Sequence, residues 1–567
     1  MNHVPLALLV LLVLSAVTLG QTAPDAAPTS RPAAFSVSID VDVAKPVGPM
    51  TPIWRFFGAD EANYAYMKDG KVLLKEIGQL GRAQTYFRTH NLLTTGDGTP
   101  ALKWGSTNAY TEDADGKPVY DWKIVDRIFD TYLANGVKPY AQVGFMPEAM
   151  STKPQPYQHE WRPGMKYDDV YTGWAYPPKD YDKFGELVYQ WVKHCVERYG
   201  QKEVESWYWQ TWNEPNIGYW KGTPQEFHRL HDVSTAAIRR ALPTARVGGC
   251  DTAGDGGKFM DAFLDHCLNG KNYATGEIGT KLDFLSFHAK GAPGFVDGHV
   301  RLGIAEQLKN IDRAFARFAR HPQLKGTPIV IGESDPDGCA ACQGKNLGYR
   351  NTTMFSSYTA ASFARKWELA DKHGVNLEGA LSWAFEFEDQ PFFAGQRVMA
   401  TNRINLPVFN VFRMMAKMEG QRVAAVSSAG VPLEKIVAGG VRGAPDVSAV
   451  AATEGGRTCV LAWHYHDDDV AGRGADTTIR VTSLPADATR LRVTRYLIDE
   501  THTNPHELWK KMDSPQNPTP QQYNELLQAG QLKPAGEAEL IAVEQGQAVV
   551  KIGLQHRGVA LLVFEQP

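Results

Sequence analysis

Residues 207–216 read Trp-Tyr-Trp-Gln-Thr-Trp-Asn-Glu-Pro-Asn, and this segment sets the interpretation of the whole chain. Aromatic residues and threonine dominate its first six positions, a composition that favours a buried β-strand. Pro215 has no backbone N–H to donate, so the strand is expected to end before it. The sequence therefore places the carboxylate of Glu214 at the carboxyl end of a strand.

Similar apolar segments recur on both sides of this strand and alternate with amphipathic ones. Apolar residues at three- and four-residue spacing predict helices, for example over 181–199 and 224–241. Eight such units over roughly 370 residues favour an α/β fold, a (β/α)8 TIM barrel across 49–420. A doubly wound open sheet is the alternative, but no glycine-rich phosphate loop follows the first strand. The predicted barrel strands are Trp54–Gly58, Gln84–Arg88, Pro139–Phe145, Ser206–Trp212, Ala245–Gly249, Phe284–His288, Pro328–Gly332 and Gly379–Phe385.

The sequence changes character after residue 420, where short strands are separated by Gly, Asp and Pro. This pattern predicts an appended C-terminal all-β sandwich domain over 421–567. An early strand within 35–48 precedes the barrel and is expected to pair into the same sheet. The predicted C-terminal strands are Val447–Thr453, Thr458–His464, Thr477–Thr482, Arg490–Ile498, Ala538–Glu544, Ala548–Ile552 and Val559–Phe564.

The segment 1–34 is unlike the rest of the chain. An apolar run from Leu6 to Val17 predicts a signal peptide over 1–20, although no Lys or Arg precedes it. Residues 21–34 (QTAPDAAPTSRPAA) are typical of a linker. Because no other apolar stretch is long enough to cross a bilayer, the mature chain is expected to be secreted or periplasmic.

Composition argues against several classes of partner. The 567 residues carry a formal net charge of −4, which lacks the basic excess that nucleic acids or anionic membranes require. The 14 Trp, 22 Tyr and 24 Phe suit stacking on sugar rings, although ordinary core packing explains most of them. A saccharide partner is therefore expected, with neither nucleic acid nor membrane.

Six cysteines are few for an exported chain, so a disulfide framework is not expected to hold the fold. Cys339 and Cys342 form one close pair, open to interpretation as a local disulfide, a redox motif or half of a metal site. No second CxxC or HxxxH motif lies nearby, which argues against zinc. We predict a disulfide that fixes the loop after Glu333, and neither a metal nor a cofactor.

A second acidic segment, 329–336 (IVIGESDP), ends the seventh predicted strand with Glu333. Barrel enzymes carry their catalytic side chains at the carboxyl ends of the strands. One such glutamate is most simply an ion-pair partner, but two on facing strands match the carboxylate pair that glycoside cleavage requires. Strands four and seven face each other, so a separation of roughly 5–5.5 Å, typical of a retaining mechanism, is expected.

These motifs resemble glycoside hydrolase family 39, which contains β-xylosidases and α-L-iduronidases. The resemblance rests on motifs in a common order: Gly144–Pro147, Trp212–Pro215, and Tyr496–Asp499 followed by Thr503, Asn504 and Trp509. It implies that Glu214 is the general acid/base, Glu333 the nucleophile, and Asn213 a partner of the sugar 2-hydroxyl. The acid needs a raised pKa, which the negative charge of Glu333 would support.

The predicted strand ends supply candidate sugar-binding residues at the barrel rim, Arg88, His90 and His288, and Trp383 either forms a sugar platform or fills the barrel top. The resemblance adds Lys290 and Arg397. Lys290 and Arg397 are similar to iduronidase positions and together would grip a uronate carboxylate. The alternative is that Lys290 pairs with Glu386 or Glu388. The segment 381–386 is closer to the β-xylosidases, so β-xyloside-type and uronide substrates both stay open.

Two other classes of function are considered. A carbohydrate-binding protein on an inactive barrel is disfavoured, because it would have no chemical reason to keep both Glu214 and Glu333. An endo-acting hydrolase would differ from the favoured exo-acting enzyme by an open groove in place of a pocket.

Overall fold

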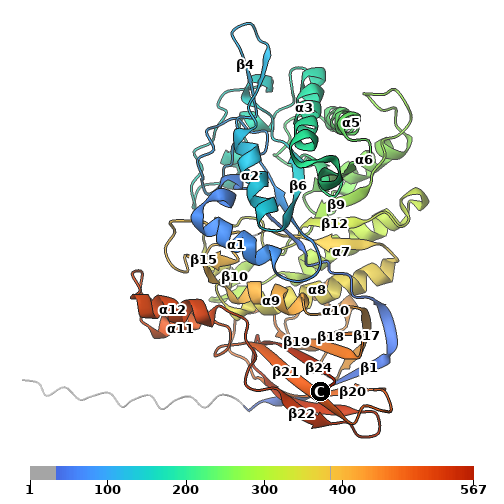
Figure 1. Cartoon of the computed structure of the whole chain (residues 1–567), viewed down its shortest axis with the longest axis vertical. Helices are drawn as coiled ribbons and strands as arrows, with labels where there is room; N and C mark the ends of the chain where they lie inside the picture. Colours follow the sequence, from blue (N-terminus) through green and yellow to red (C-terminus); the bar gives the residue numbers. More distant parts are fainter. Residues whose placement is uncertain (1–32, 384) are drawn as a thin grey trace, which may run out of the picture.

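The computed structural model describes residues 33–383 and 385–567, in two parts (Figure 1). The barrel fills the upper part of the view, and the orange and red C-terminal sheet lies at its lower end. The predicted signal peptide and most of the predicted linker lie outside the described residues. Within the described ranges no helix combines the length and apolar character that crossing a membrane requires.

The predicted barrel is confirmed, because its parallel sheet closes on itself through the eighth strand. That strand is split at Leu381: β13 pairs with β12, whereas β14 pairs with β2. Such closure rules out the doubly wound open sheet. In order around the barrel the strands are β13 (Leu377–Ala380), β12 (Ile329–Glu333), β9 (Phe284–His288), β8 (Arg246–Thr252), β7 (Tyr208–Thr211), β6 (Val137–Val143), β3 (Thr85–Thr89), β2 (Phe56–Ala59) and β14 (Ser382–Trp383).

Helices follow the strands, and two of them have the predicted bounds because their ends are capped. The Asp180 side chain accepts from the backbone N–H groups of Asp182 and Lys183, and a capping box joins Thr223 to Glu226. The principal helices of the barrel are α1 (Lys68–Gly78), α2 (Lys123–Ala134), α3 (Tyr181–Tyr199), α5 (Pro224–Ala241), α6 (Gly257–Asn269), α7 (Ile304–Ala319), α8 (Thr353–His373) and α9 (Pro407–Met415), with the short α4 (Gln201–Val204).

The barrel interior changes from aromatic to polar along the strands. A buried cluster of mostly aromatic side chains fills it: Phe56, Tyr86, Tyr140, Tyr208, Phe284, Val330, Leu381 and Trp383. Side chains two positions apart on a strand point the same way, so Arg88, Gln210 and Ser286 continue this interior one step nearer the rim. All three are buried. The apolar layer thus supports a polar layer, on which the rim residues stand.

The C-terminal sheet joins nine strands of the described chain, and the N-terminal strand belongs to it. β1 (Phe35–Pro49) pairs antiparallel with β17 (Gln421–Ser427) and parallel with β20 (Ala475–Thr482). The sequence did not predict β17, whose short alanine-rich run has weak strand propensity. The other strands are β18 (Asp446–Glu454), β19 (Arg457–Tyr465), β21 (Arg490–Ile498), β22 (Glu539–Ala542), β23 (Ala548–Leu554) and β24 (Val559–Glu565).

Alternating side chains of β19 serve two cores. Leu461, Trp463 and Tyr465 belong to the large core shared with the barrel, whereas Val460 and Ala462 belong to a second core on the other face. Sheet and barrel are therefore packed together. The remaining helices are α10 (Leu433–Gly439), α11 (Pro505–Lys511) and α12 (Pro520–Ala529), and three hairpins are β4 (Tyr110–Glu112) with β5 (Pro118–Tyr120), β10 (Gly294–Val296) with β11 (His299–Arg301), and β15 (Ala400–Thr401) with β16 (Ile404–Asn405).

Candidate active site

The two predicted carboxylates lie at the carboxyl ends of β7 and β12. Glu333 is the last residue of β12, and Glu214 follows β7 by a sharp turn in which Trp212 and Glu214 have φ of 66° and 44°. This left-handed backbone is uncommon outside glycine and concentrates at functional sites. The Glu214 N–H donates to the carbonyl of Asp251 at 2.9 Å, which anchors the turn to β8.

Lys290 lies between the two carboxylates. Its Nζ is 2.7 Å from Glu214 Oε1 and 2.6 Å from Glu333 Oε2. The buried His288 places Nδ1 2.8 Å from Glu214 Oε1 and 3.6 Å from Glu333 Oε1. One carboxylate oxygen of Glu214, one ring nitrogen of His288 and one carboxylate oxygen of Glu333 lie within 4.8 Å of one another. The two carboxylates therefore face each other closely enough to act on one bond.

These cations set the ionisation of both glutamates. Burial opposes a charge on Glu214, but Lys290 and His288 outweigh it and lower its pKa to about 2. Burial likewise opposes a charge on Glu333, and His288, Lys290 and Arg88 hold its pKa well below its usual range. The expected raised pKa of Glu214 is thus not found, because Lys290 and His288 lie against its carboxylate.

Arg88 orients the site and is not itself open to a sugar. It is fully buried; Nε donates to Gln210 Oε1 at 2.7 Å, and Nη2 donates to Asn213 Oδ1 at 2.9 Å. Nη2 also lies 3.0 Å from Asp251 Oδ2, and Nη1 lies 3.4 Å from Glu333 Oε1. Because its oxygen accepts from Arg88, the Asn213 amide directs its N–H groups elsewhere. Arg88 therefore links Gln210, Asn213, Asp251 and Glu333 beneath the rim.

His90 and Trp383 lie together beside Glu333. His90 Nδ1 is 2.5 Å from Asp60 Oδ1, and Nε2 is 2.9 Å from Arg88 Nη1 and 3.8 Å from Glu333 Oε1. Burial, followed by the charge of Arg88, lowers the pKa of His90 well below its usual value, so the ring is neutral. The Trp383 ring centroid lies 4.4 Å from that of His90. The structure thus brings both residues to the site.

Arg397 does not join Lys290 in a clamp, contrary to the expectation from sequence. Its guanidinium is fully buried, with Nη1 2.8 Å from Asp335 Oδ2 and Nε 3.3 Å from Asp337 Oδ1. It also donates to the carbonyl of Trp383. Asp335 and Asp337 follow Glu333 on the same loop and compensate the charge of Arg397, which the local motif did not reveal.

The alternative partners proposed for Lys290 are also wrong. Glu386 Oε1 accepts from the backbone N–H of Arg403 at 2.6 Å, and Glu388 Oε2 accepts from that of Asp69 at 3.0 Å. Lys290 reaches Glu214 and Glu333 instead. The ammonium group of Lys290 is therefore paired with the two glutamates of the candidate site.

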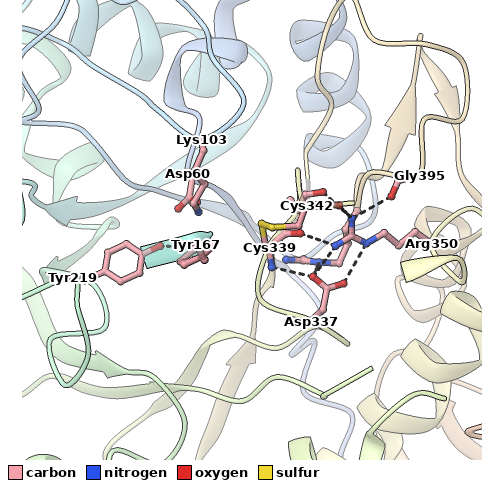
Figure 2. Close-up of a disulfide and its surroundings, with 11 residues drawn as sticks. Asp60, Lys103, Tyr167, Tyr219, Asp337, Cys339, Cys342, Arg350 and Gly395 are labelled. Carbon is pink, nitrogen blue, oxygen red and sulfur yellow. Dashed lines mark hydrogen bonds and ion pairs between the residues drawn. A yellow bond between two sulfur atoms is a disulfide. The ribbon is translucent and has the colours of Figure 1, made fainter. Parts of the chain in front are cut away.

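Sequence reasoning missed several residues that border the site. Lys103 pairs with Asp60, its Nζ lies 5.2 Å from the ring centroid of Tyr167, and Tyr167 shares a 2.5 Å hydroxyl hydrogen bond with Tyr219 (Figure 2). Asp60 directly follows the first barrel strand, so the strand-end rule that found Glu333 could have found it. Lys103 lies in a loop and Tyr167 begins the short 3-10 helix η3 (Tyr167–Val170), so no periodic pattern marks them.

The predicted disulfide between Cys339 and Cys342 is present. Arg350 holds its loop: the guanidinium donates to the carbonyls of Cys339 and Cys342, each at 2.6 Å, and to that of Gly395 at 3.1 Å (Figure 2). It also donates to Asp337 Oδ1 at 2.9 Å. The loop that carries Asp337 is thus tied down on both sides of the disulfide.

Comparison with known proteins agrees with this geometry. The family model "Glycosyl hydrolases family 39" matches residues 37–548. The β-xylosidase of Geobacillus stearothermophilus is 25% identical over 526 residues, 88% of this chain and 89% of that protein. The α-L-iduronidase of Mus musculus is 25% identical over 535 residues, 86% of this chain and 75% of that protein.

A solved structure shares the fold. The crystal structure of the GH39 enzyme from Xanthomonas axonopodis pv. citri superposes with a TM-score of 0.71 at 21% sequence identity, covering 95% of this chain and all of that one. The shared fold therefore agrees with the family match, which extends along most of the chain. This protein therefore belongs to glycosyl hydrolases family 39 and is a glycosidase.

Proposed function

We propose that this protein is a retaining glycosidase acting on a β-xyloside-type substrate, with Glu333 as nucleophile and Glu214 as general acid/base. The observation that carries the mechanism is the pair of buried carboxylates facing each other at the ends of β7 and β12. The xyloside assignment rests on charge. Lys290 is engaged by both glutamates and Arg397 by two aspartates, so neither stands ready for a substrate carboxylate.

In the first step a carboxylate oxygen of Glu333 attacks the anomeric carbon while Glu214 protonates the departing oxygen. In the second step Glu214 takes a proton from water, which displaces Glu333 from the sugar. The Asn213 amide oxygen accepts from Arg88, and in this mechanism its N–H group donates to the 2-hydroxyl. Substrate binding has to loosen the contact between Lys290 and Glu214 before that acid can carry its proton.

The stereochemistry of the product tests this mechanism. Two displacements at one carbon invert it twice, so the first sugar released should have the anomeric configuration of the substrate. Proton NMR of the initial product from an aryl β-xyloside distinguishes the anomers before they interconvert. Release of the α-anomer first would contradict the double displacement.

A uronide is the second candidate, because Lys290 is a cation at the catalytic centre and α-L-iduronidases are among the relatives. Lys290→Ala removes an ammonium from both glutamates, so activity should fall on every substrate. If Lys290 binds a uronate, uronide kcat/KM should fall by more than about tenfold beyond the fall for the matching pentoside. Kinetics on both aryl glycosides give this ratio, and an unchanged ratio would leave the β-xyloside assignment.

A further inference from the structure

Asp251 is a fully buried acid beside the two glutamates, and the proposed mechanism does not use it. It is the extra residue of a β-bulge in β8, because Cys250 and Thr252 pair with consecutive residues of β9. Its φ of 45° is left-handed, a backbone that is strained outside glycine and concentrates at functional sites. Bulges redirect side chains, so this one sets where the Asp251 carboxylate points.

The carboxylate of Asp251 reaches β12 and two side chains of the site. A Cβ on Gly332 would lie 2.0 Å from Asp251 Oδ1, so the glycine leaves the room that this oxygen occupies. Oδ2 lies 3.0 Å from Arg88 Nη2, and Oδ1 lies 3.5 Å from His288 Nε2. Among the described residues no other group pairs with His288 Nε2. Asp251 therefore faces one nitrogen of this buried imidazole, while Glu214 faces the other, Nδ1, at 2.8 Å.

The carboxylates on both sides of His288 determine its protonation. Only the imidazolium carries a proton on each nitrogen, so this form satisfies both neighbours at once. Burial opposes a charge on the ring, but Glu333, Asp251 and Glu214 outweigh it and raise the pKa of His288. The other titratable or charged groups that contact these carboxylates are Arg88, His90 and Lys290.

The two protons of this imidazolium are not equivalent, because they face different acids. We propose that Asp251 is a positioning residue that acts through His288: it keeps a proton on Nε2 and leaves the Nδ1 proton to exchange with Glu214. This inference rests on the proposed role of Glu214 as general acid/base.

The exchange supplies the proton that Glu214 needs as an acid. When substrate binding loosens the contact between Lys290 and Glu214, the Nδ1–H bond of His288 breaks and an O–H bond forms on Glu214 Oε1. A neutral imidazole and a carboxylic acid result, and the departing oxygen of the substrate takes the proton from the acid. The proton that Glu214 later accepts from water returns to Nδ1, so the cycle is balanced.

Asp251→Asn keeps the shape of the side chain but removes a counter-ion of the imidazolium, so His288 should lose its proton more easily. The basic limb of the kcat/KM profile for xylobiose, whose leaving group needs the proton, should move to lower pH by about one unit. The basic limb for β-D-xylosyl fluoride, whose leaving group needs little protonation, should stay in place. A purely structural role would lower both activities alike and move neither limb.

Asp446→Asn is the matched control for this variant. Asp446 is also fully buried and paired with an arginine, Arg365, but it lies in β18 of the C-terminal sheet. Its replacement should cost stability and leave both basic limbs unmoved. Thermal unfolding of the two variants compares their losses of stability.

A second measurement uses wild-type enzyme and decides the inference even if Asp251→Asn fails to fold. With ¹⁵N-labelled histidine, the NMR signals of His288, assigned by their absence from His288→Asn, show which ring nitrogens carry a proton. Nε2 should stay protonated throughout the pH range of activity. A ring protonated on Nδ1 alone would overturn the inference, and so would a folded Asp251→Asn enzyme with an unmoved xylobiose limb. Wild-type inactivity on both substrates would instead count against the proposed xyloside activity, and the NMR test of Asp251 would still stand.

Discussion

Glu333→Ala is expected to reduce turnover of every glycoside by roughly 10⁴-fold or more, because it removes the carboxylate that we propose as the nucleophile. Its carboxylate is buried, ionised, and within 2.6 Å of Lys290. Good leaving groups should not restore activity, since the missing step is the attack on carbon. Steady-state kinetics on aryl glycosides and on β-D-xylosyl fluoride measure the loss.

Glu378→Gln provides the matched control for this variant. Glu378 also forms an ion pair, with Arg55, but it lies in β13. It accepts a hydrogen bond from Tyr208, which belongs to the aromatic layer of the barrel interior. Its removal should cost some stability and little activity. Thermal unfolding of Glu333→Ala should show a folded protein. A folded Glu333→Ala enzyme with more than about a tenth of wild-type activity would contradict the nucleophile assignment.

Glu214→Ala is expected to separate substrates by their leaving groups. Glycosides with poor leaving groups need the proton and should lose about 10²–10⁴-fold in rate. Substrates with very good leaving groups, such as β-D-xylosyl fluoride, should lose little in the first step. Hydrolysis of the glycosyl-enzyme then slows, because water has lost its base. Azide, which needs no base, should restore turnover and yield a glycosyl azide of retained configuration.

The direction of azide rescue decides the assignment of the two glutamates. Rescue of Glu214→Ala is the expected outcome, because the small cavity left there adjoins the side from which water attacks. If azide restored Glu333→Ala instead and gave the inverted azide, the two roles would be exchanged. Product analysis by NMR, with Glu378→Gln as the control that needs no rescue, makes this distinction.

The fold and the position of Glu214 and Glu333 at the barrel rim were accessible to sequence reasoning because both depend on local patterns. Apolar residues recur every two positions in the strands and every three to four positions in the helices, and this periodicity marks each β/α unit. Glu214 and Glu333 each follow such a strand directly, and a parallel barrel collects all strand ends at one rim. Capping residues such as Asp180 and Thr223 even set the bounds of α3 and α5.

Prediction was weaker where a side chain finds its partner across the barrel. Lys290 was predicted at the rim, but its place between Glu214 and Glu333 joins three different strand ends. Arg397 was predicted to face substrate, whereas Asp335 and Asp337 draw it inward from a loop 60 residues away. No spacing along the chain encodes either outcome.

The primary structure thus suffices for the barrel, the appended sheet, the disulfide and the two glutamates, all consequences of periodicity and short-range motifs. Charge compensation is a different matter, because it depends on which side chains meet in three dimensions and on how deeply they are buried. The low pKa of Glu214, the buried Arg397, the Lys103–Asp60 pair and the contacts of Asp251 with Arg88 and His288 all follow from packing between distant segments. Those contacts exist only after the strands have closed into a ring.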